Sequence, residues 1–203
     1  MIKEIVVANS GYLNCKSCFY TSHDTLQEQD VFRFTIGINQ LIGDIDSGIW
    51  GISYLLSMYN IDICKKMLFN PPIAMVNGEE IFLESLTNSC CYLDHTAYPL
   101  FSSKRKTVRQ LIKKGIKKSG SKLNVEEIID MFSLDSSRVD RPINCVGNER
   151  FRAMAAIGYA YGKQIFCFPW LSKKMFDYYT NNILYLLDVL EKCGMIVILP
   201  VGR

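Results

Sequence analysis

Two glycines, Gly43 and Gly48, have the spacing of a loop that could hold a phosphate group. They lie between a predicted strand and a predicted helix, where backbone N–H groups can surround a phosphate near the positive end of the helix. The complete motif continues with Lys and then Ser or Thr, which contact phosphate and magnesium. Ile49 and Trp50 occupy those positions, and the Asp46 carboxylate would repel phosphate. The loop alone is therefore a weak indication of nucleotide binding.

Cysteine and histidine side chains offer other chemistry. Cys15, Cys18 and His23 supply three zinc ligands, whereas a structural zinc site needs four with paired spacing. The 8 cysteines could also pair with His23 or His95 as nucleophile and base, but no local pattern selects one pair. We therefore expect free thiols and no metal site.

The composition is that of a globular protein with a substantial core. The chain has 203 residues, of which 49% are hydrophobic and 21% charged, so wholesale disorder is excluded. The length fits one domain over residues 1–203, and the net charge of +3 is too small to indicate a partner. The longest apolar run, near Met195 to Val201, is far shorter than a membrane span. We expect a cytoplasmic protein with no transmembrane segment.

Hydrophobic periodicity predicts the elements that position these residues. Asn77-Gly78 predicts a hairpin, Asn124 predicts the start of a helix over Val125–Phe132, and Asp135–Gly147 has no clear pattern. Further helices are expected at Ile49–Met58, Glu149–Gly162 and Lys174–Cys193. Further strands are expected at Glu4–Ala8, Phe32–Ile38, Ser89–Leu93, Gln164–Phe168 and Met195–Leu199. Apolar strands that alternate with helices indicate an α/β fold with a largely parallel sheet.

The segment Lys104–Lys122 is strongly basic and contains no acidic residue. Its apolar residues recur at helical spacing, which predicts a basic amphipathic helix with Gly115 as a weak point. Three interpretations stay open: a solvated face, a docking surface for an acidic partner, or a site for nucleic acid or anionic lipid. The absence of interleaved aromatic residues argues against nucleic acid. A docking surface would use Lys104, Arg105, Arg109, Lys113 and Lys117.

From about Phe32 to its C-terminus the chain resembles the nucleotide-binding domain of ATP-binding cassette (ABC) transporters. Asn39–Gly48 resembles the phosphate loop of that family, and Cys91–Val108 resembles the segment that carries its Q-loop. Val146–Ala155 resembles the signature loop and the helix after it. Gln164–Phe168 and Met195–Leu199 resemble the Walker B strand and the strand before the switch histidine. The resemblance implies a phosphate-loop NTPase-like fold, with a mixed, mainly parallel sheet and a small helical insertion over residues 102–145.

The chain departs from the family at most positions that carry chemistry. The phosphate loop retains only a remnant, made of Gly43, Asp46, Ser47, Gly48, Ile49 and Trp50. The Q-loop glutamine falls at His95 or Thr96, and the two Walker B acids fall at Pro169 and Trp170. The signature loop is reduced to Val146, Gly147, Asn148, Glu149 and Arg152.

These departures predict a degenerate ABC ATPase-like protein that does not hydrolyse ATP. Phosphoryl transfer needs a lysine, a magnesium ion and a polarising acid. At the expected positions the sequence has no lysine, no side chains that hold magnesium and no acid. We expect no cofactor, although Mg–ATP stays an alternative. The protein would bind a partner: a membrane permease, an active ATPase subunit or a second copy of itself. One alternative is a functional ATP-binding subunit with an unusual site, whose polar groups would be Asp94, His95, Arg150 and Arg152. A second alternative is a peptide- or nucleic-acid-binding adaptor that uses the basic helix.

Overall fold

The computed structural model describes residues 1–8, 31–43, 51–58, 73–94 and 106–203. Its strands are β1 (Glu4–Ala8), β2 (Val31–Thr35), β3 (Gly37–Ile42), β4 (Ile73–Val76), β5 (Glu79–Ile81), β6 (Cys90–Tyr92), β7 (Ile165–Cys167) and β8 (Ile196–Val201). Its α-helices are α1 (Gly51–Met58), α3 (Leu83–Thr87), α4 (Val108–Ser119), α5 (Val125–Met131), α6 (Ser136–Val139), α7 (Arg150–Ala160) and α8 (Lys173–Lys192). Two short 3-10 turns, η3 (Ile143–Cys145) and η4 (Gly147–Glu149), precede α7.

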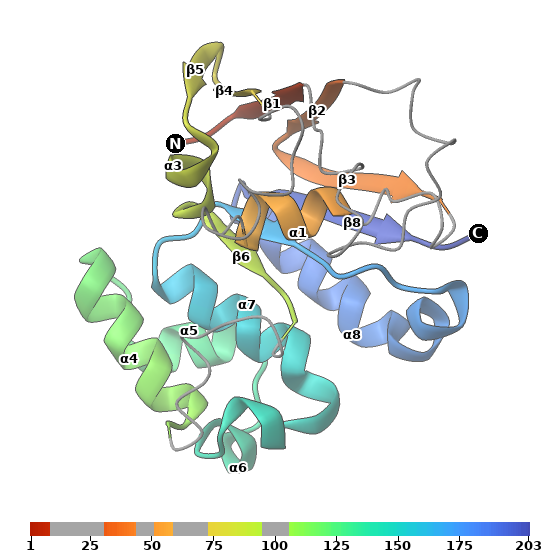
Figure 1. Ribbon diagram of the computed structural model, residues 1–203. Coiled ribbons are helices and arrows are strands. Elements are labelled where there is room, and N and C mark those ends of the chain that lie inside the picture. The colour runs from red at the N-terminus through yellow and green to blue at the C-terminus, as the bar shows by residue number, and fades with distance from the viewer. Residues whose placement is uncertain (9–30, 44–50, 59–72, 95–105) are drawn as a thin grey trace.

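The central sheet of the described residues is parallel, as the sequence predicts. Its strand order is β3-β8-β7-β6, and each neighbouring pair is parallel. Helices α7 and α8 pack on one face, and α1 lies over the other (Figure 1). Because all four strands run in the same direction, their carboxyl ends lie at one edge of the sheet.

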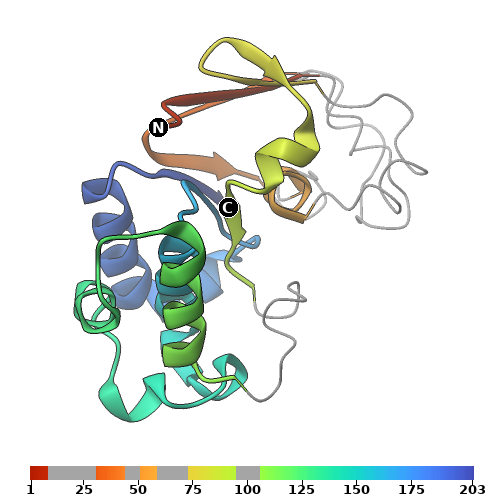
Figure 2. The same ribbon diagram turned by 90° about the vertical axis from the view of Figure 1, so that its left-hand side faces the viewer.

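The N-terminal strands form a separate antiparallel sheet, with the order β2-β1-β4-β5. The predicted hairpin at Asn77-Gly78 is confirmed, and both residues have positive φ, 51° and 87°, which favours a tight turn. Figure 2 shows this sheet above the parallel sheet and the helices.

The prediction of one strand over Phe32–Ile38 is wrong, because the chain changes sheets within that range. β2 ends at Thr35 and β3 begins at Gly37, which has φ +97°. Ile36 N–H donates to the Lys3 carbonyl beside β1, whereas Gly37 N–H donates to the Met195 carbonyl beside β8. A glycine tolerates this left-handed backbone without strain.

Helix α5 begins after Asn124, as predicted, and the basic segment Lys104–Lys122 contains the shorter helix α4. Thr107 and Gln110 form a capping box at α4, and Asn124 and Glu127 form one at α5. The predicted weak point at Gly115 is instead a close contact: a Cβ there would lie 2.9 Å from Ala160 of α7. The segment Asp135–Gly147, which has no clear pattern, contains α6 and η3.

Two hydrophobic clusters lie on opposite faces of the parallel sheet. The α7–α8 side takes Cys91, Phe166, Val197 and Leu199, and the α1 side takes Cys90, Ile165, Cys167, Ile196 and Ile198. Successive residues of a strand point to opposite faces, so strands buried on both sides have continuous apolar sequences. This arrangement explains why β7 and β8 have apolar sequences without alternation.

Candidate functional site

The carboxyl edge of the parallel sheet brings the end of β3 against the ends of β7 and β8. Gly43 N–H donates to the Val201 carbonyl at 3.0 Å. Beyond β7, Leu171 N–H donates to Pro200 O at 3.1 Å, and Gly202 N–H donates to Leu171 O at 2.8 Å. Backbone pairing therefore continues past the strands, at the edge where the predicted phosphate-loop remnant begins.

Trp170, at a predicted Walker B position, lies at this edge. Its indole N–H donates to the Gly43 carbonyl at 3.1 Å. The indole also covers Gly202, because a Cβ at Gly202 would lie only 2.8 Å from the Trp170 ring. Neither Pro169 nor Trp170 offers a carboxylate, so these two positions supply no oxygen ligand from a side chain for magnesium.

Several predicted site residues lie outside the described part of the chain. They are Asp46, Ser47, Gly48, Ile49 and Trp50 of the phosphate-loop remnant, His95 and Thr96 at the Q-loop position, Lys104 and Arg105 of the basic segment, and Cys15, Cys18 and His23. Within the described ranges, no three His, Cys, Asp or Glu side chains are grouped so that they could hold a metal ion.

The residues of the predicted signature-loop remnant form a structural turn. Val146 is buried, and Gly147 has φ +63° in the first position of η4. Arg138 of α6 donates to the Asn148 side chain and, at 3.4 Å, to the Val146 carbonyl. The Asn148 side chain and the Val146 carbonyl are thus bound to α6.

Glu149 is the buried acid of this region, and its partners lie inside the same network. Its side chain is 10% exposed and accepts the Asp135 N–H at 3.2 Å. Its carboxylate lies 3.4 Å from Arg152 and 3.7 Å from Arg138. Arg152 also donates to the Ser133 carbonyl at 2.7 Å. Glu149 and Arg152, both predicted site residues, therefore join α6, α7 and the end of α5.

A hollow of about 380 Å³ lies beside this loop. Asn144, Asn148, Arg150, Tyr178 and Tyr179 are among its lining residues. The Arg150 guanidinium lies 4.9 Å from the Phe151 ring centre and 5.7 Å from that of Tyr179, and it forms no ion pair with any described carboxylate. Cation–π contacts of this length hold the guanidinium against the aromatic rings.

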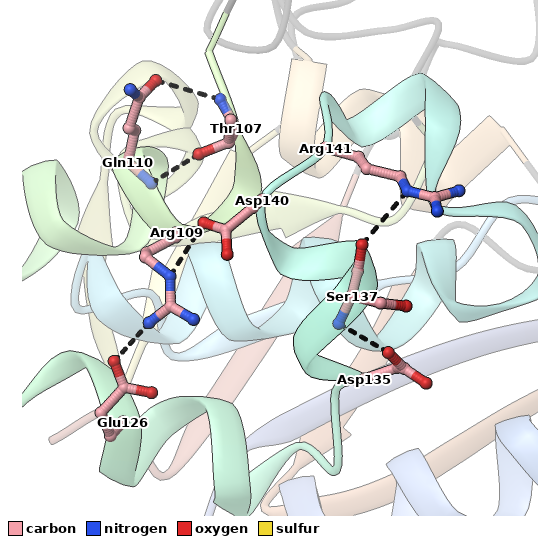
Figure 3. A network of polar contacts seen from close by, with 8 residues as sticks. All are labelled: Thr107, Arg109, Gln110, Glu126, Asp135, Ser137, Asp140 and Arg141. Atoms are coloured by element: carbon pink, nitrogen blue, oxygen red, sulfur yellow. Dashed lines mark hydrogen bonds and ion pairs between the residues drawn. The ribbon is translucent and has the colours of Figure 1, made fainter.

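The predicted docking residue Arg109 is bound internally. Figure 3 shows its guanidinium between Asp140, at 2.9 Å, and Glu126. The hydrogen bond with Asp140 is the main cause that raises the pKa of Arg109. Lys113 and Lys117, the other described docking residues, are exposed on α4.

Comparison with known proteins supports the fold alone. No protein-family model matches the sequence, and no curated protein matches it. Among solved structures, the chain is similar to a bacterial Atm1-family ABC exporter with ATP bound, with TM-score 0.60 and 12% identity over 100% of this chain and 35% of the exporter chain. It is also similar to a putative ABC transporter ATP-binding protein from Pyrococcus furiosus, with TM-score 0.61 and 14% identity over 98% of this chain and 96% of that one. The fold is thus like that of ABC ATP-binding proteins.

The sequence did not indicate every residue of these sites. Nothing in its local pattern pairs Arg138 with Glu149, because the two meet only when α6 folds against η4. The Tyr178 and Tyr179 rings were expected within a helix, but their place beside Arg150 depends on the packing of α8 against α7.

None of the described helices combines the length and the apolar composition that a bilayer span needs.

Proposed function

We propose that this chain is a phosphate-loop NTPase-like protein of the ABC ATPase kind that does not hydrolyse ATP and acts by binding a partner. In this proposal residues 1–203 form one domain, and residues 102–145 form a helical insertion within it. The partner is a membrane permease, an active ATPase subunit or a second copy of the chain. The protein works in the cytoplasm and reaches the membrane through that partner.

The contact between Trp170 and Gly43 is the observation that carries the proposal. A metal-binding acid would have to project from the end of β7 toward the loop that follows β3. In this chain the indole N–H donates to the Gly43 carbonyl from that position. The ring is large and apolar, and it lies against Gly43 at the start of the predicted loop, where it offers no ligand for magnesium.

The chemistry of the remaining positions supports the same conclusion. Catalysis of phosphoryl transfer depends on a cation and a metal that stabilise charge on the phosphoryl oxygens. Ile49 and Trp50 offer no cation, and Pro169 and Trp170 offer no carboxylate. Of the signature-loop remnant, Glu149 and Arg152 are bound to each other and to neighbouring segments. The role left to such a domain is binding.

Thermal unfolding with and without Mg–ATP tests the closed site. A ligand that binds only the folded state at 100 times its Kd adds about 2.7 kcal/mol, which raises the midpoint by several degrees. We expect no shift at millimolar Mg–ATP and no phosphate release above that of a buffer blank. ADP and magnesium alone are the matched controls. A shift specific to ATP would contradict the closed site, and turnover that follows the protein through purification would contradict the proposal.

Sedimentation of the purified protein tests whether the partner is a second copy. Self-association in a concentration-dependent manner would support a homodimer. A monomer at all concentrations would leave a different protein as the partner, to be found by crosslinking in cells and identified by mass spectrometry.

A further inference from the structure

Four lysines of α4 form one exposed face, which we call the lysine face: Lys113, Lys114, Lys117 and Lys118. Successive lysines are one, three and one residues apart, and Lys113–Lys117 and Lys114–Lys118 are each four apart, so all four project from the same side of the helix. The opposite side is fixed in the core, because Val108, Leu111, Ile112 and Gly115 are buried. In Figure 2, α4 lies in front of α7, at the outer surface of the helical region.

The ammonium groups of the lysine face are not neutralised by the described parts of the chain. None of them forms an ion pair with a described carboxylate, whereas Arg109 on the same helix pairs with Asp140 and Glu126. Glu127 of the neighbouring α5 is bound to the backbone of Asn124 as a cap. Lys118 lies 5.9 Å from the centre of the Tyr161 ring, which leaves its charge in place.

Helix stability explains only some of the lysines on this face. Cations in the last turn of a helix interact favourably with its dipole, which accounts for Lys117 and Lys118. Lys113 and Lys114 lie one turn earlier, where the effect has decayed. Like charges four residues apart, as in the pairs Lys113–Lys117 and Lys114–Lys118, destabilise a helix slightly. The face therefore carries a small cost in stability.

We propose that the lysine face binds the surface of a membrane that contains anionic phospholipids. Protein interfaces are depleted in Lys and enriched in aromatic residues and Arg, and the lysine face contains neither. Single-stranded nucleic acid would need aromatic side chains for stacking, which the lysine face also lacks. Lysine ammonium groups are flexible and strongly hydrated, so they can follow mobile anionic headgroups without a fixed geometry. Each Lys near such a surface contributes about 1 kcal/mol to the free energy of membrane binding.

No described apolar side chain of α4 is strongly exposed, so the contact is electrostatic and α4 does not insert into the bilayer. The C-terminus, beside the end of β8, lies on the other side of the molecule from α4 in Figure 1. The inference therefore goes beyond the proposed function, and the nucleotide experiment does not bear on it.

Vesicle co-sedimentation tests the inference with the full chain. The probes are phosphatidylcholine vesicles with about 30 mol% phosphatidylserine, and vesicles of phosphatidylcholine alone. We expect binding to the anionic vesicles only, and loss of that binding as the salt rises from about 50 mM to about 500 mM. The variant Lys113→Gln/Lys114→Gln/Lys117→Gln/Lys118→Gln should bind at least about tenfold more weakly.

A second variant, Lys3→Gln/Lys173→Gln/Lys174→Gln/Lys192→Gln, is the matched control, because it removes the same charge from other exposed sites. It should retain most of the binding, and the unfolding midpoints of both variants should stay close to that of the parent. Equal loss in the two variants, or equal binding to neutral vesicles, would overturn the inference. Tighter binding to single-stranded RNA or to polyglutamate than to anionic vesicles at the same salt would also overturn it.

Discussion

The indole N–H of Trp170 donates a hydrogen bond to the carbonyl of Gly43, which lies 127 positions earlier in the chain. The bond joins the end of β7 to the end of β3, although β8 lies between these strands in the sheet. One side chain therefore spans the edge at which a phosphate-loop protein would hold its ligand.

Substitution of Trp170 should separate the hydrogen bond from the bulk of the ring. Trp170→Phe loses the N–H donor and should lower the free energy of unfolding by about 1 kcal/mol. Trp170→Ala also loses packing against Gly202 and should cost about 2–4 kcal/mol. Urea unfolding measures both values. If the ring also excludes nucleotide, only Trp170→Ala should gain a shift in midpoint with Mg–ATP. An equal nucleotide response in parent, Phe and Ala variants would show that the ring does not control access.

Glu149 should behave as a structural acid. Glu149→Ala leaves Arg152, whose side chain is 13% exposed, without its carboxylate and should lower the free energy of unfolding by about 3 kcal/mol. Glu149→Gln retains an acceptor for the Asp135 N–H and should cost less. Asp188→Asn is the matched control: it breaks an exposed ion pair with Lys192 and should change stability by less than about 1 kcal/mol. Similar small effects for all three variants would contradict a structural role.

Gly158 should tolerate no larger residue while Cys91 faces it. A Cβ at Gly158 would lie 2.5 Å from the Cys91 sulfur and 3.2 Å from the Phe166 ring. Gly158→Ala should therefore destabilise the protein by about 1–3 kcal/mol, despite the better helix propensity of Ala. In the double variant with Cys91→Ala the sulfur is absent, so its cost should be smaller than the sum of the two single costs. Strict additivity in urea unfolding would exclude the proposed clash.

The Cys91 thiol should make stability fall at alkaline pH. Burial raises the pKa of Cys91 from its ordinary value of 9.0 to about 12. Between these values the unfolded chain releases the proton and the folded chain keeps it, so the folded state loses relative stability as pH rises above 9.0. Between pH values of about 8 and 10, Cys91→Ser should lose about 1 kcal/mol less than the parent. Identical losses in urea titrations of the two proteins would contradict the raised pKa.

Cys145 is exposed and should react with a thiol reagent before Cys91 does.

The sequence predicts the fold well where local patterns decide the structure. The Asn77-Gly78 hairpin and the Asn124–Glu127 capping box depend on residues a few positions apart, and both were predicted. The capping box of Thr107 and Gln110 is equally local but was not predicted. The parallel strands β7 and β8 were predicted because strands buried on both faces have continuous apolar sequences. The break at Ile36 was missed, because it depends on which distant strand accepts each neighbouring residue.

For the candidate site, the sequence predicts which side chains are missing but not which contacts the present side chains make. That Pro169 and Trp170 carry no carboxylate at the predicted Walker B positions can be seen in the sequence alone. The hydrogen bond from Trp170 to Gly43 could not be predicted, since it depends on the order of strands in the sheet. The same limit applies to Arg109, which the sequence places on a basic helix while its ion-pair partners come from α5 and the end of α6.

The division of β7 and β8 between two hydrophobic clusters has a consequence for cooperativity. Residues that alternate along these strands belong to the cluster under α7 and α8 or to the cluster under α1. If the side chains of either cluster lose their packing, one face of β7 and β8 becomes exposed. The loss of either cluster therefore destabilises the strands on which the other cluster is built. The amide protons of Phe166 and Val197 should therefore exchange with solvent only through global unfolding, and both halves of the molecule should lose structure in a single transition.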